Sequence, residues 1–202
     1  MIVYVETPER ERHARLVDDY FQLRKRVFHD EMGWNVRVTG ELERDVLDEH
    51  PCTYGLSVDA GGRLNAGIRL IPTTQMTLLE LAFDGLVPDR LSFRSPTIWE
   101  VSRFCIDRTA PGGWVSAGLD RAALELMLAN FGYARRNGIT HYLAVTEERM
   151  LRLAGQFGIP VDVLGRQQIE GCDVVCGLIP VNSQTATMAR KMQPLVEGRK
   201  SA

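Results

Sequence analysis

Two opposite charges interrupt one apolar segment near the middle of the 202-residue sequence. Glu100 and Arg103 lie in the run 97–106, whose other residues are mostly apolar or β-branched and predict a strand. A buried strand tolerates few unpaired charges. Because the two residues are three positions apart, regular pleating sends them to opposite faces unless a bulge intervenes. The strand can then serve two sides of a site, or each charge can have its own ion pair.

A further arginine falls on the apolar face of an expected helix. Thr7 and Pro8 offer a helix start, and the helix to about Phe28 carries an apolar stripe that contains Arg24. An arginine on a buried face needs carboxylate partners or a ligand anion. The alternative is an arginine that snorkels at the edge of the stripe.

Carboxylates follow in a stretch without clear periodicity, residues 31–50. Such a stretch is usually mobile or part of a site. Asp45 and Asp48 lie near its end and could share one helical face. Solvated loop carboxylates are the commoner explanation of such a pair.

The remaining sequence predicts the elements that must position these charges. Arg69 lies in the second strand of an expected hairpin, 54–58 and 63–71, beside Gly67, where a small residue leaves room. The other expected elements are a strand at 2–5, a helix at 76–83, the strand at 97–106, a loop at 111–113, a helix from about Ser116 to 137–138, strands at 139–145 and 174–180, and helices at 147–156 and 182–192. This alternation predicts an α/β fold, a mixed sheet sandwiched by helices.

Composition predicts one ordinary globular domain over residues 1–202, with 45% hydrophobic and 25% charged residues. The net charge of −2 argues against a strongly basic nucleic-acid-binding protein. We expect no membrane span and no signal peptide, hence a cytoplasmic protein. Cys52, Cys105, Cys172 and Cys176 form no CxxC pair, so reduced, buried thiols are expected rather than a zinc site.

The charged residues, taken in order with their neighbours, resemble one family. The matching set is Leu23-Arg24-Lys25-Arg26-Val27-Phe28, then Trp34, Asp45 and Asp48, then Ile68-Arg69-Leu70, and finally Trp99-Glu100-Val101-Ser102-Arg103-Phe104. With this spacing the chain resembles the acyl-homoserine-lactone synthases, the autoinducer synthases of bacterial quorum sensing. The resemblance is strong over roughly the first 110 residues and looser beyond.

The resemblance implies a fold similar to that of the N-acetyltransferases, a strongly twisted mixed sheet with helices on both faces. It also implies a reaction. The amine of S-adenosylmethionine attacks an acyl thioester, and the substrate carboxylate then closes a lactone and displaces methylthioadenosine. The acyl donor is acyl-carrier protein, the preferred expectation, or acyl-coenzyme A. S-adenosylmethionine is a substrate, so no cofactor and no metal are expected.

Roles for the residues follow from the same resemblance. Glu100 is expected as general base, since the attacking amine must lose a proton. Asp45 and Asp48 would hold the ammonium end or orient the pocket. Arg24, Arg69 and Arg103 would pair with these acids, and one of them could meet the substrate carboxylate. Phe28, Trp34 and Phe104 would face adenine and the sulfonium cation. The alternative is a structural salt-bridge network that shapes the cleft without chemistry.

The resemblance also points to residues for the acyl-chain site. By position, Leu143 and Thr146 would contact the acyl chain, with Met76, Leu126 and Met127 as possible lining, although such stripes are more often plain core. Arg149 and Arg152, with Arg135 and Arg136, could form a basic surface for acidic acyl-carrier protein, although exposed arginines are common.

Two rival functions are considered. Acetyl-coenzyme A acyltransferases cradle the pyrophosphate with Gly-x-Gly or Gly-x-Ala at a helix start, whereas here Gly112 and Gly113 are adjacent and follow Pro111. A non-catalytic paralogue that binds S-adenosylmethionine or a partner is the second rival. Acyl length, oxidation at the third carbon, the donor and the oligomeric state remain open.

Overall fold

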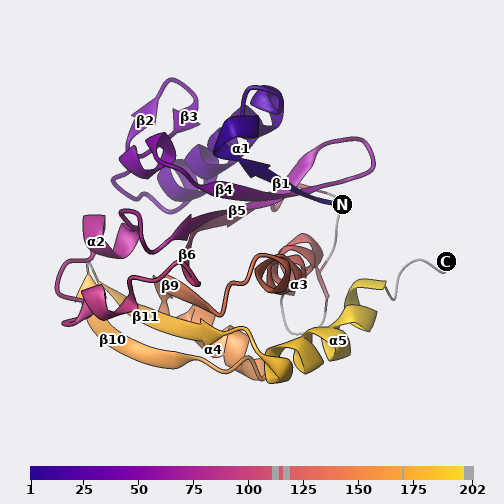
Figure 1. The fold of residues 1–202 in the computed structure, drawn as a ribbon. Coiled ribbons are helices and arrows are strands. Elements are labelled where there is room, and N and C mark those ends of the chain that lie inside the picture. Colours follow the sequence, from indigo (N-terminus) through magenta and orange to yellow (C-terminus); the bar gives the residue numbers. More distant parts are fainter. Residues whose placement is uncertain (111–113, 116–118, 170, 198–202) are drawn as a thin grey trace. The chain divides into compact units, whose positions relative to one another are not determined.

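The computed structural model describes residues 1–110, 114–115, 119–169 and 171–197, which form two compact units (Figure 1). The first unit is Met1–Leu70 with Arg103–Ala129, and the second is Ile71–Ser102 with Asn130–Ala202. The boundaries fall within strands β5 (Leu64–Pro72) and β6 (Ile98–Ile106) and within helix α3 (Arg121–Arg136). A single domain over 1–202 stays a prediction. The loop expected at 111–113 and the helix start at Ser116 lie outside the described residues.

The sheet of the first unit carries the strands β1 (Ile2–Glu6), β4 (Thr53–Val58) and β5 in that order (Figure 1). Neighbouring strands are antiparallel, and Tyr54 of β4 pairs with Arg69 of β5. The predicted hairpin is confirmed. In its turn the Asp59 side chain accepts hydrogen bonds from the backbone N–H groups of Gly61 and Arg63, at 2.8 and 2.9 Å.

The first helix starts later than predicted. Thr7–Glu9 forms only a 3₁₀ turn, η1, and the α-helix α1 covers Ala14–Arg24. The Thr7 hydroxyl is engaged with the backbone of Cys52, as donor at 3.1 Å and acceptor at 2.9 Å, so it cannot cap a helix. After Arg24 the chain continues as a π-helical turn, η2 (Lys25–Glu31), which is the wide helical geometry often found at functional sites.

The segment 31–50 is more ordered than its sequence suggested. Two short strands, β2 (Val38–Thr39) and β3 (Leu42–Glu43), pair around Gly40, whose φ of 60° favours glycine. A 3₁₀ turn, η3 (Val46–Glu49), follows, and Asp45 caps its start. Elsewhere in this unit β7 (Trp114–Val115) pairs with β8 (Leu119–Asp120).

The second unit carries β6, β9 (His141–Glu147), β11 (Cys172–Pro180) and β10 (Asp162–Ile169) in that order. The pair β6–β9 is parallel and the other two pairs are antiparallel, so the sheet is mixed, as predicted. Strand β10 was not predicted. The helices of this unit are α2 (Leu78–Ala82), the 3₁₀ turn η4 (Arg90–Phe93), α4 (Glu148–Gln156) and α5 (Ser183–Glu197).

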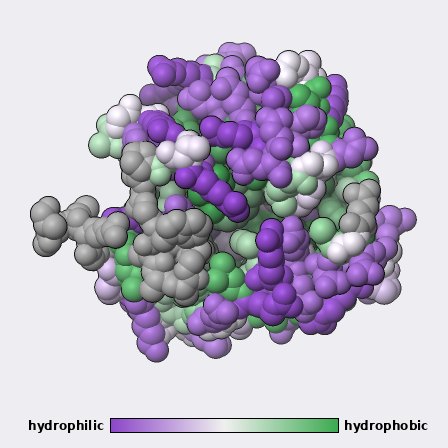
Figure 2. All heavy atoms as spheres, turned by 180° about the vertical axis from the view of Figure 1, so that it is seen from behind, coloured by the Kyte–Doolittle hydropathy of each residue, from purple (hydrophilic) through white to green (hydrophobic). Residues whose placement is uncertain are grey.

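Apolar side chains close the second unit's core around Leu79, Leu86, Leu143 and Cys176. Hydrophilic residues predominate on the face drawn in Figure 2, with smaller hydrophobic areas among them. All four cysteines are free, and the expectation that all are buried is wrong for Cys172, which is exposed next to the β10–β11 turn. No helix of the described residues is long and apolar enough to cross a membrane.

Candidate active site

Arg24 ends helix α1 with a completely buried side chain. Its guanidinium fork donates to both oxygens of Asp48, at 2.9 Å each, and its Nε donates to Glu43. The rings of Tyr20 and Phe21, one turn earlier, lie 5.4 and 5.1 Å from its guanidinium carbon. Such partners are what a buried arginine requires. The alternative of an arginine snorkelling at the surface is therefore wrong.

Arg69 lies on β5 and is also fully buried. Its Nη1 and Nη2 donate to the two oxygens of Asp45, the second at 2.9 Å, and Nη1 also reaches Asp48 at 3.0 Å. Asp45 and Asp48 can meet one arginine because they form a capping box at η3, in which each side chain accepts a backbone N–H from the turn.

Arg103 completes the cluster from β6. Its side chain contacts Glu43 at 3.2 Å and Asp45 at 2.9 Å. Its φ of 54° lies in the left-handed region, which a non-glycine residue adopts at a cost of roughly 1–2 kcal/mol. The backbone at Arg103 therefore departs from regular pleating, so the pleating argument that put Glu100 and Arg103 on opposite faces does not apply unchanged.

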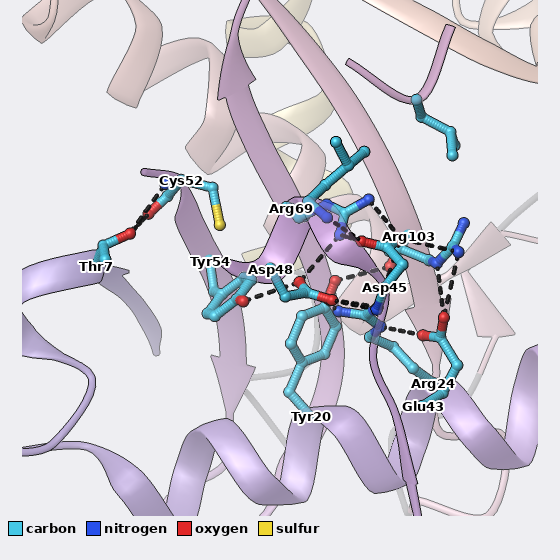
Figure 3. A network of polar contacts seen from close by, with 12 residues as sticks. Thr7, Tyr20, Arg24, Glu43, Asp45, Asp48, Cys52, Tyr54, Arg69 and Arg103 are labelled. Atoms are coloured by element: carbon cyan, nitrogen blue, oxygen red, sulfur yellow. Dashed lines mark hydrogen bonds and ion pairs between the residues drawn. The ribbon is translucent and has the colours of Figure 1, made fainter. Parts of the chain in front are cut away.

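Three guanidiniums and three carboxylates thus form one network, drawn in Figure 3, which we call the arginine–carboxylate cluster: Arg24, Arg69, Arg103, Glu43, Asp45 and Asp48. Asp48 is its most saturated member, since it accepts from Arg24, Arg69, the Tyr54 hydroxyl at 2.9 Å and the Asp45 backbone. Burial alone would raise the pKa of Asp48, but Arg24 and Arg69 outweigh it and hold that pKa well below its ordinary value. Asp48 is therefore a permanent anion and a poor proton acceptor.

Aromatic rings adjoin the cluster. Phe28, in η2, stacks on Trp34 with ring centroids 5.2 Å apart, and the Arg103 guanidinium lies 5.6 Å from the Phe28 centroid. Phe28 is buried, whereas Trp34 is 38% exposed. Phe104, next to Arg103 on β6, is half-buried. An exposed ring backed by a buried one offers a face on which a flat or cationic ligand group can lie.

Glu100 is described within the second unit, where its side chain is fully buried. Its Oε1 accepts the backbone N–H of Leu78 at 2.8 Å, and its Oε2 accepts that of Leu79 at 2.9 Å. These are the first two residues of α2, whose start is also capped by Thr77 in a capping box with Glu80. Glu100 therefore anchors α2, a contact that the sequence analysis did not foresee.

The sequence analysis missed Glu43, a member of the cluster, and Tyr54, whose hydroxyl donates to Asp48. One signal could have found Glu43: it is two positions before Asp45 in an extended segment, so both side chains can point to the same side. Tyr54 carries no such signal, because a tyrosine on a buried strand is ordinary.

The expected acyl-chain residues are spread over different surfaces. Leu143 and Thr146 are three apart on β9, and the unbroken register with β11 puts them on opposite faces of the strand. Leu143 packs with Leu79 in the second unit's core, and Thr146 is half-buried. Among the suggested lining residues, Met76 is 44% exposed, Leu126 is buried and Met127 is half-buried.

The arginines expected to form a basic surface are exposed. Arg149 pairs with Glu147 at 2.6 Å, and Arg152 lies 3.6 Å from Glu148. These acids offset much of the positive charge on α4. Arg135 and Arg136 are exposed near the end of α3.

The comparisons with known proteins complete this description. The model of the autoinducer synthase family matches residues 8–188. The chain belongs to the autoinducer synthase family. It is 30% identical over 189 residues to an acyl-homoserine-lactone synthase of Rhizobium etli, covering 93% of this chain and 88% of that protein. The predicted enzyme class, an acyltransferase of the acyl-homoserine-lactone synthase family, is thereby confirmed.

Solved structures agree. The acyl-homoserine-lactone synthase LasI has a TM-score of 0.83 with 27% identity, over 95% of this chain and 94% of that one. BjaI, a coenzyme-A-dependent synthase solved with S-adenosylmethionine and isopentyl-coenzyme A, has a TM-score of 0.82 with 25% identity, over 100% of this chain and 90% of that one. An N-acetyltransferase from Lactobacillus plantarum shares the fold, with a TM-score of 0.59, 19% identity, and 90% and 98% coverage. The predicted twisted, N-acetyltransferase-like α/β fold is confirmed.

Proposed function

We propose that this chain makes an N-acyl-L-homoserine lactone, a quorum-sensing signal, from S-adenosylmethionine and an acyl thioester. The deprotonated amine attacks the thioester carbonyl, a C–N bond forms, the C–S bond breaks, and the donor thiol leaves with a proton. The substrate carboxylate then attacks the carbon attached to the sulfonium, so that a C–O bond closes the lactone and methylthioadenosine departs.

The observation that carries this proposal is the arginine–carboxylate cluster. The six side chains come from α1, β3, β5, β6 and the start of η3, segments that are far apart in the sequence. Two of the arginines are buried and the third is nearly so, which is costly because every charge removed from water must be compensated. Two solved relatives support the substrates: BjaI with S-adenosylmethionine and isopentyl-coenzyme A, and TofI with methylthioadenosine.

Exposure divides the cluster into two kinds of residue. Arg24, Arg69, Glu43 and Asp48 are buried and paired within the cluster, so we assign them to holding the segment 43–48 in place. The side chains of Asp45 and Arg103 retain 11% and 10% exposure. We therefore assign Asp45 to the ammonium group of S-adenosylmethionine and Arg103 to its carboxylate, with Trp34, Phe28 and Phe104 beside the adenine or the sulfonium.

Glu100 is assigned as the general base. A carboxylate can take the ammonium proton, directly or through a water, which is the chemistry that the attack on the thioester requires. The two N–H groups of α2 fix the orientation of the carboxylate, which a base must have.

The function is tested by incubating the purified protein with S-adenosylmethionine and a panel of acyl thioesters. Mass spectrometry should find methylthioadenosine and an acyl-homoserine lactone in equal amounts, and the product mass would identify the acyl group. Binding of S-adenosylmethionine without either product would favour a non-catalytic paralogue. Acylation of another amine, with no methylthioadenosine, would favour an N-acetyltransferase-like enzyme.

The preferred donor is proposed to be acyl-carrier protein, with the exposed arginines Arg149 and Arg152 on its docking surface, and Arg135 and Arg136 as further candidates. The double variant Arg149→Ala/Arg152→Ala should raise KM for the carrier-protein substrate about tenfold at low salt and leave KM for the matching acyl-coenzyme A unchanged. An equal KM for the carrier-protein substrate in parent and variant would remove these residues from docking. If only acyl-coenzyme A supports turnover, the donor assignment is wrong.

For the acyl chain we propose that Thr146 or Leu143 contacts it, but not both from one wall, because they point to opposite faces of β9. Comparing Thr146→Val with Leu143→Ala across acyl lengths would show which face is used, through a changed length preference.

No cofactor or metal is proposed, so dialysis against a chelator should leave turnover unchanged. The cytoplasm is the proposed location, because S-adenosylmethionine and acyl thioesters are made there.

A further inference from the structure

Tyr20 is a completely buried residue of α1 that plays no part in the assignments above. It lies four positions before Arg24, on the same face of the helix. Its hydroxyl donates to the backbone carbonyl oxygen of Arg103 at 2.9 Å, across a sequence separation of 83 residues (Figure 3). Tyr20 is thus joined to the backbone of the one non-glycine residue that has a positive φ among those described.

The sheet leaves space for this ring. Gly67 on β5 faces Tyr20, and a Cβ atom at position 67 would lie 2.4 Å from two of the ring carbons. A glycine in a strand interior weakens the strand, and it often marks a place where another group approaches closely. The close approach here is that of Tyr20, whose ring also lies 5.3 Å from that of Tyr54.

The Arg103 backbone needs such support. Residues held in the left-handed region persist only where their surroundings over-determine them. The side chain of Arg103 is held by Glu43 and Asp45, and its peptide carbonyl by Tyr20. Rotation of this peptide would move the guanidinium away from both carboxylates.

We propose that Tyr20 is a positioning residue, whose hydroxyl fixes the left-handed peptide of Arg103 and thereby aims its guanidinium at Glu43 and Asp45. The inference rests on the proposed function, because Asp45 and Arg103 are the cluster residues assigned to the substrate. Burial raises the pKa of Tyr20 well above its ordinary value of 10.0, so the hydroxyl keeps its proton and remains a donor.

A purely space-filling ring would make the hydroxyl dispensable, and this alternative defines the test. Tyr20→Phe keeps the ring and removes only the donor. The matched control is Tyr142→Phe in the second unit, where a buried tyrosine likewise donates to a backbone carbonyl, that of Asn130, at 2.8 Å. Both variants lose one hydrogen bond of the same kind, so their melting temperatures should fall by similar amounts.

The decisive comparison is a double-mutant cycle with Arg103→Gly, which removes both the guanidinium and the backbone cost. In the parent background Tyr20→Phe should lower kcat/KM about tenfold, the scale of one buried hydrogen bond. In the Arg103→Gly background it should change kcat/KM less than about twofold, since no guanidinium remains to be aimed. Tyr142→Phe should have the same small effect in both backgrounds. An equal loss from Tyr20→Phe in both backgrounds, or no loss in either, overturns the proposal.

A second readout does not depend on turnover. Hydrogen exchange at the Asp45 and Leu47 amides, which are bonded within the η3 turn, should accelerate about tenfold in Tyr20→Phe. Exchange in β4 should not change, and Tyr142→Phe should leave both segments alone. If the parent protein forms no product, the proposed function is wrong, but the exchange rates still test the role of Tyr20. Unchanged exchange at the Asp45 and Leu47 amides in Tyr20→Phe would count against that role.

Discussion

The chain buries carboxylates in two different ways. In the first unit, Asp48 is surrounded by arginines, and formal charges cancel within the cluster. In the second unit, Glu100 receives backbone N–H groups at the start of α2. Guanidiniums neutralise a carboxylate and fix it as an anion, whereas backbone N–H groups orient a carboxylate without placing a counter-charge beside it. The first arrangement suits a scaffold, and the second holds the residue that we propose as the proton acceptor.

The largest expected effect comes from breaking the first arrangement. Arg24→Ala should lower the free energy of unfolding by about 3–5 kcal/mol, because it leaves Asp48 and Glu43 buried with one partner fewer. Urea unfolding measures the change. The matched control is Arg26→Ala, two residues on and 44% exposed, which should cost less than about 1 kcal/mol. Similar losses for the two variants would mean that the cluster contributes no more than a surface pair.

The second arrangement is tested by separating its two roles. Glu100→Gln should lower kcat at least about 100-fold, because an amide cannot accept the proton. Thr77→Ala frays the start of α2 without touching Glu100, costs about 1 kcal/mol in stability, and should leave kcat within about threefold. Single-turnover kinetics with both variants measures this. If Thr77→Ala loses as much activity as Glu100→Gln, then Glu100 acts by anchoring α2.

Unfolding at low pH tests whether the Asp48 carboxylate is stabilised as an anion in the folded protein. The folded pKa of Asp48 is well below its ordinary value of 3.8, so the unfolded chain binds the proton more readily and stability rises with pH. The contribution is complete above the unfolded pKa and is lost progressively as pH falls through it toward the folded pKa. Urea unfolding below about pH 4 should show a slope of up to about 1.4 kcal/mol per pH unit from this group. The same series on Asp48→Asn should be flatter; an equal slope would refute the assignment.

The smallest expected effect concerns the packing of the Tyr20 ring of α1 against Gly67 of β5 in the first unit. Gly67→Ala brings a methyl group into the Tyr20 ring and should destabilise the protein by about 1–3 kcal/mol. Gly132→Ala is the control, because in α3 its Cβ would meet only the end of the flexible Arg136 side chain, at 3.4 Å. That change should stabilise by up to about 1 kcal/mol through helix propensity. Thermal unfolding of both variants would show opposite signs, and a stabilised Gly67→Ala would disprove the tight contact.

Local pattern predicted much of the fold because turn chemistry and apolar periodicity act over short range. The β4–β5 hairpin, strand β6 and helix α4 were found in this way. Strand β10 was missed because it lies at the edge of the sheet and several of its side chains are exposed and polar, including Arg166, Gln167 and Gln168. The start of α1 was misplaced because the Thr7 side chain is taken by Cys52, a contact 45 residues away that no local signal reports.

The candidate site divides along the same line. The charged residues were selected by their spacing and the family resemblance, and the ion pairs of Asp45 and Asp48 with arginines are present in the structure. Glu43, the left-handed backbone of Arg103 and the α2 amides bound to Glu100 depend on contacts between distant segments. Tyr20 looked like one more member of an apolar stripe, because its hydroxyl partner is 83 residues away.

The sharing of partners within the arginine–carboxylate cluster also limits how such a sequence can diverge. Glu43 and Asp48 each pair with two arginines and Asp45 pairs with three, so a substitution at any one of the six positions removes a partner from at least two others. A single substitution in the cluster is therefore not expected to be neutral. Descendants are expected either to inherit the whole set or to replace several members together, even after most of the surrounding sequence has drifted.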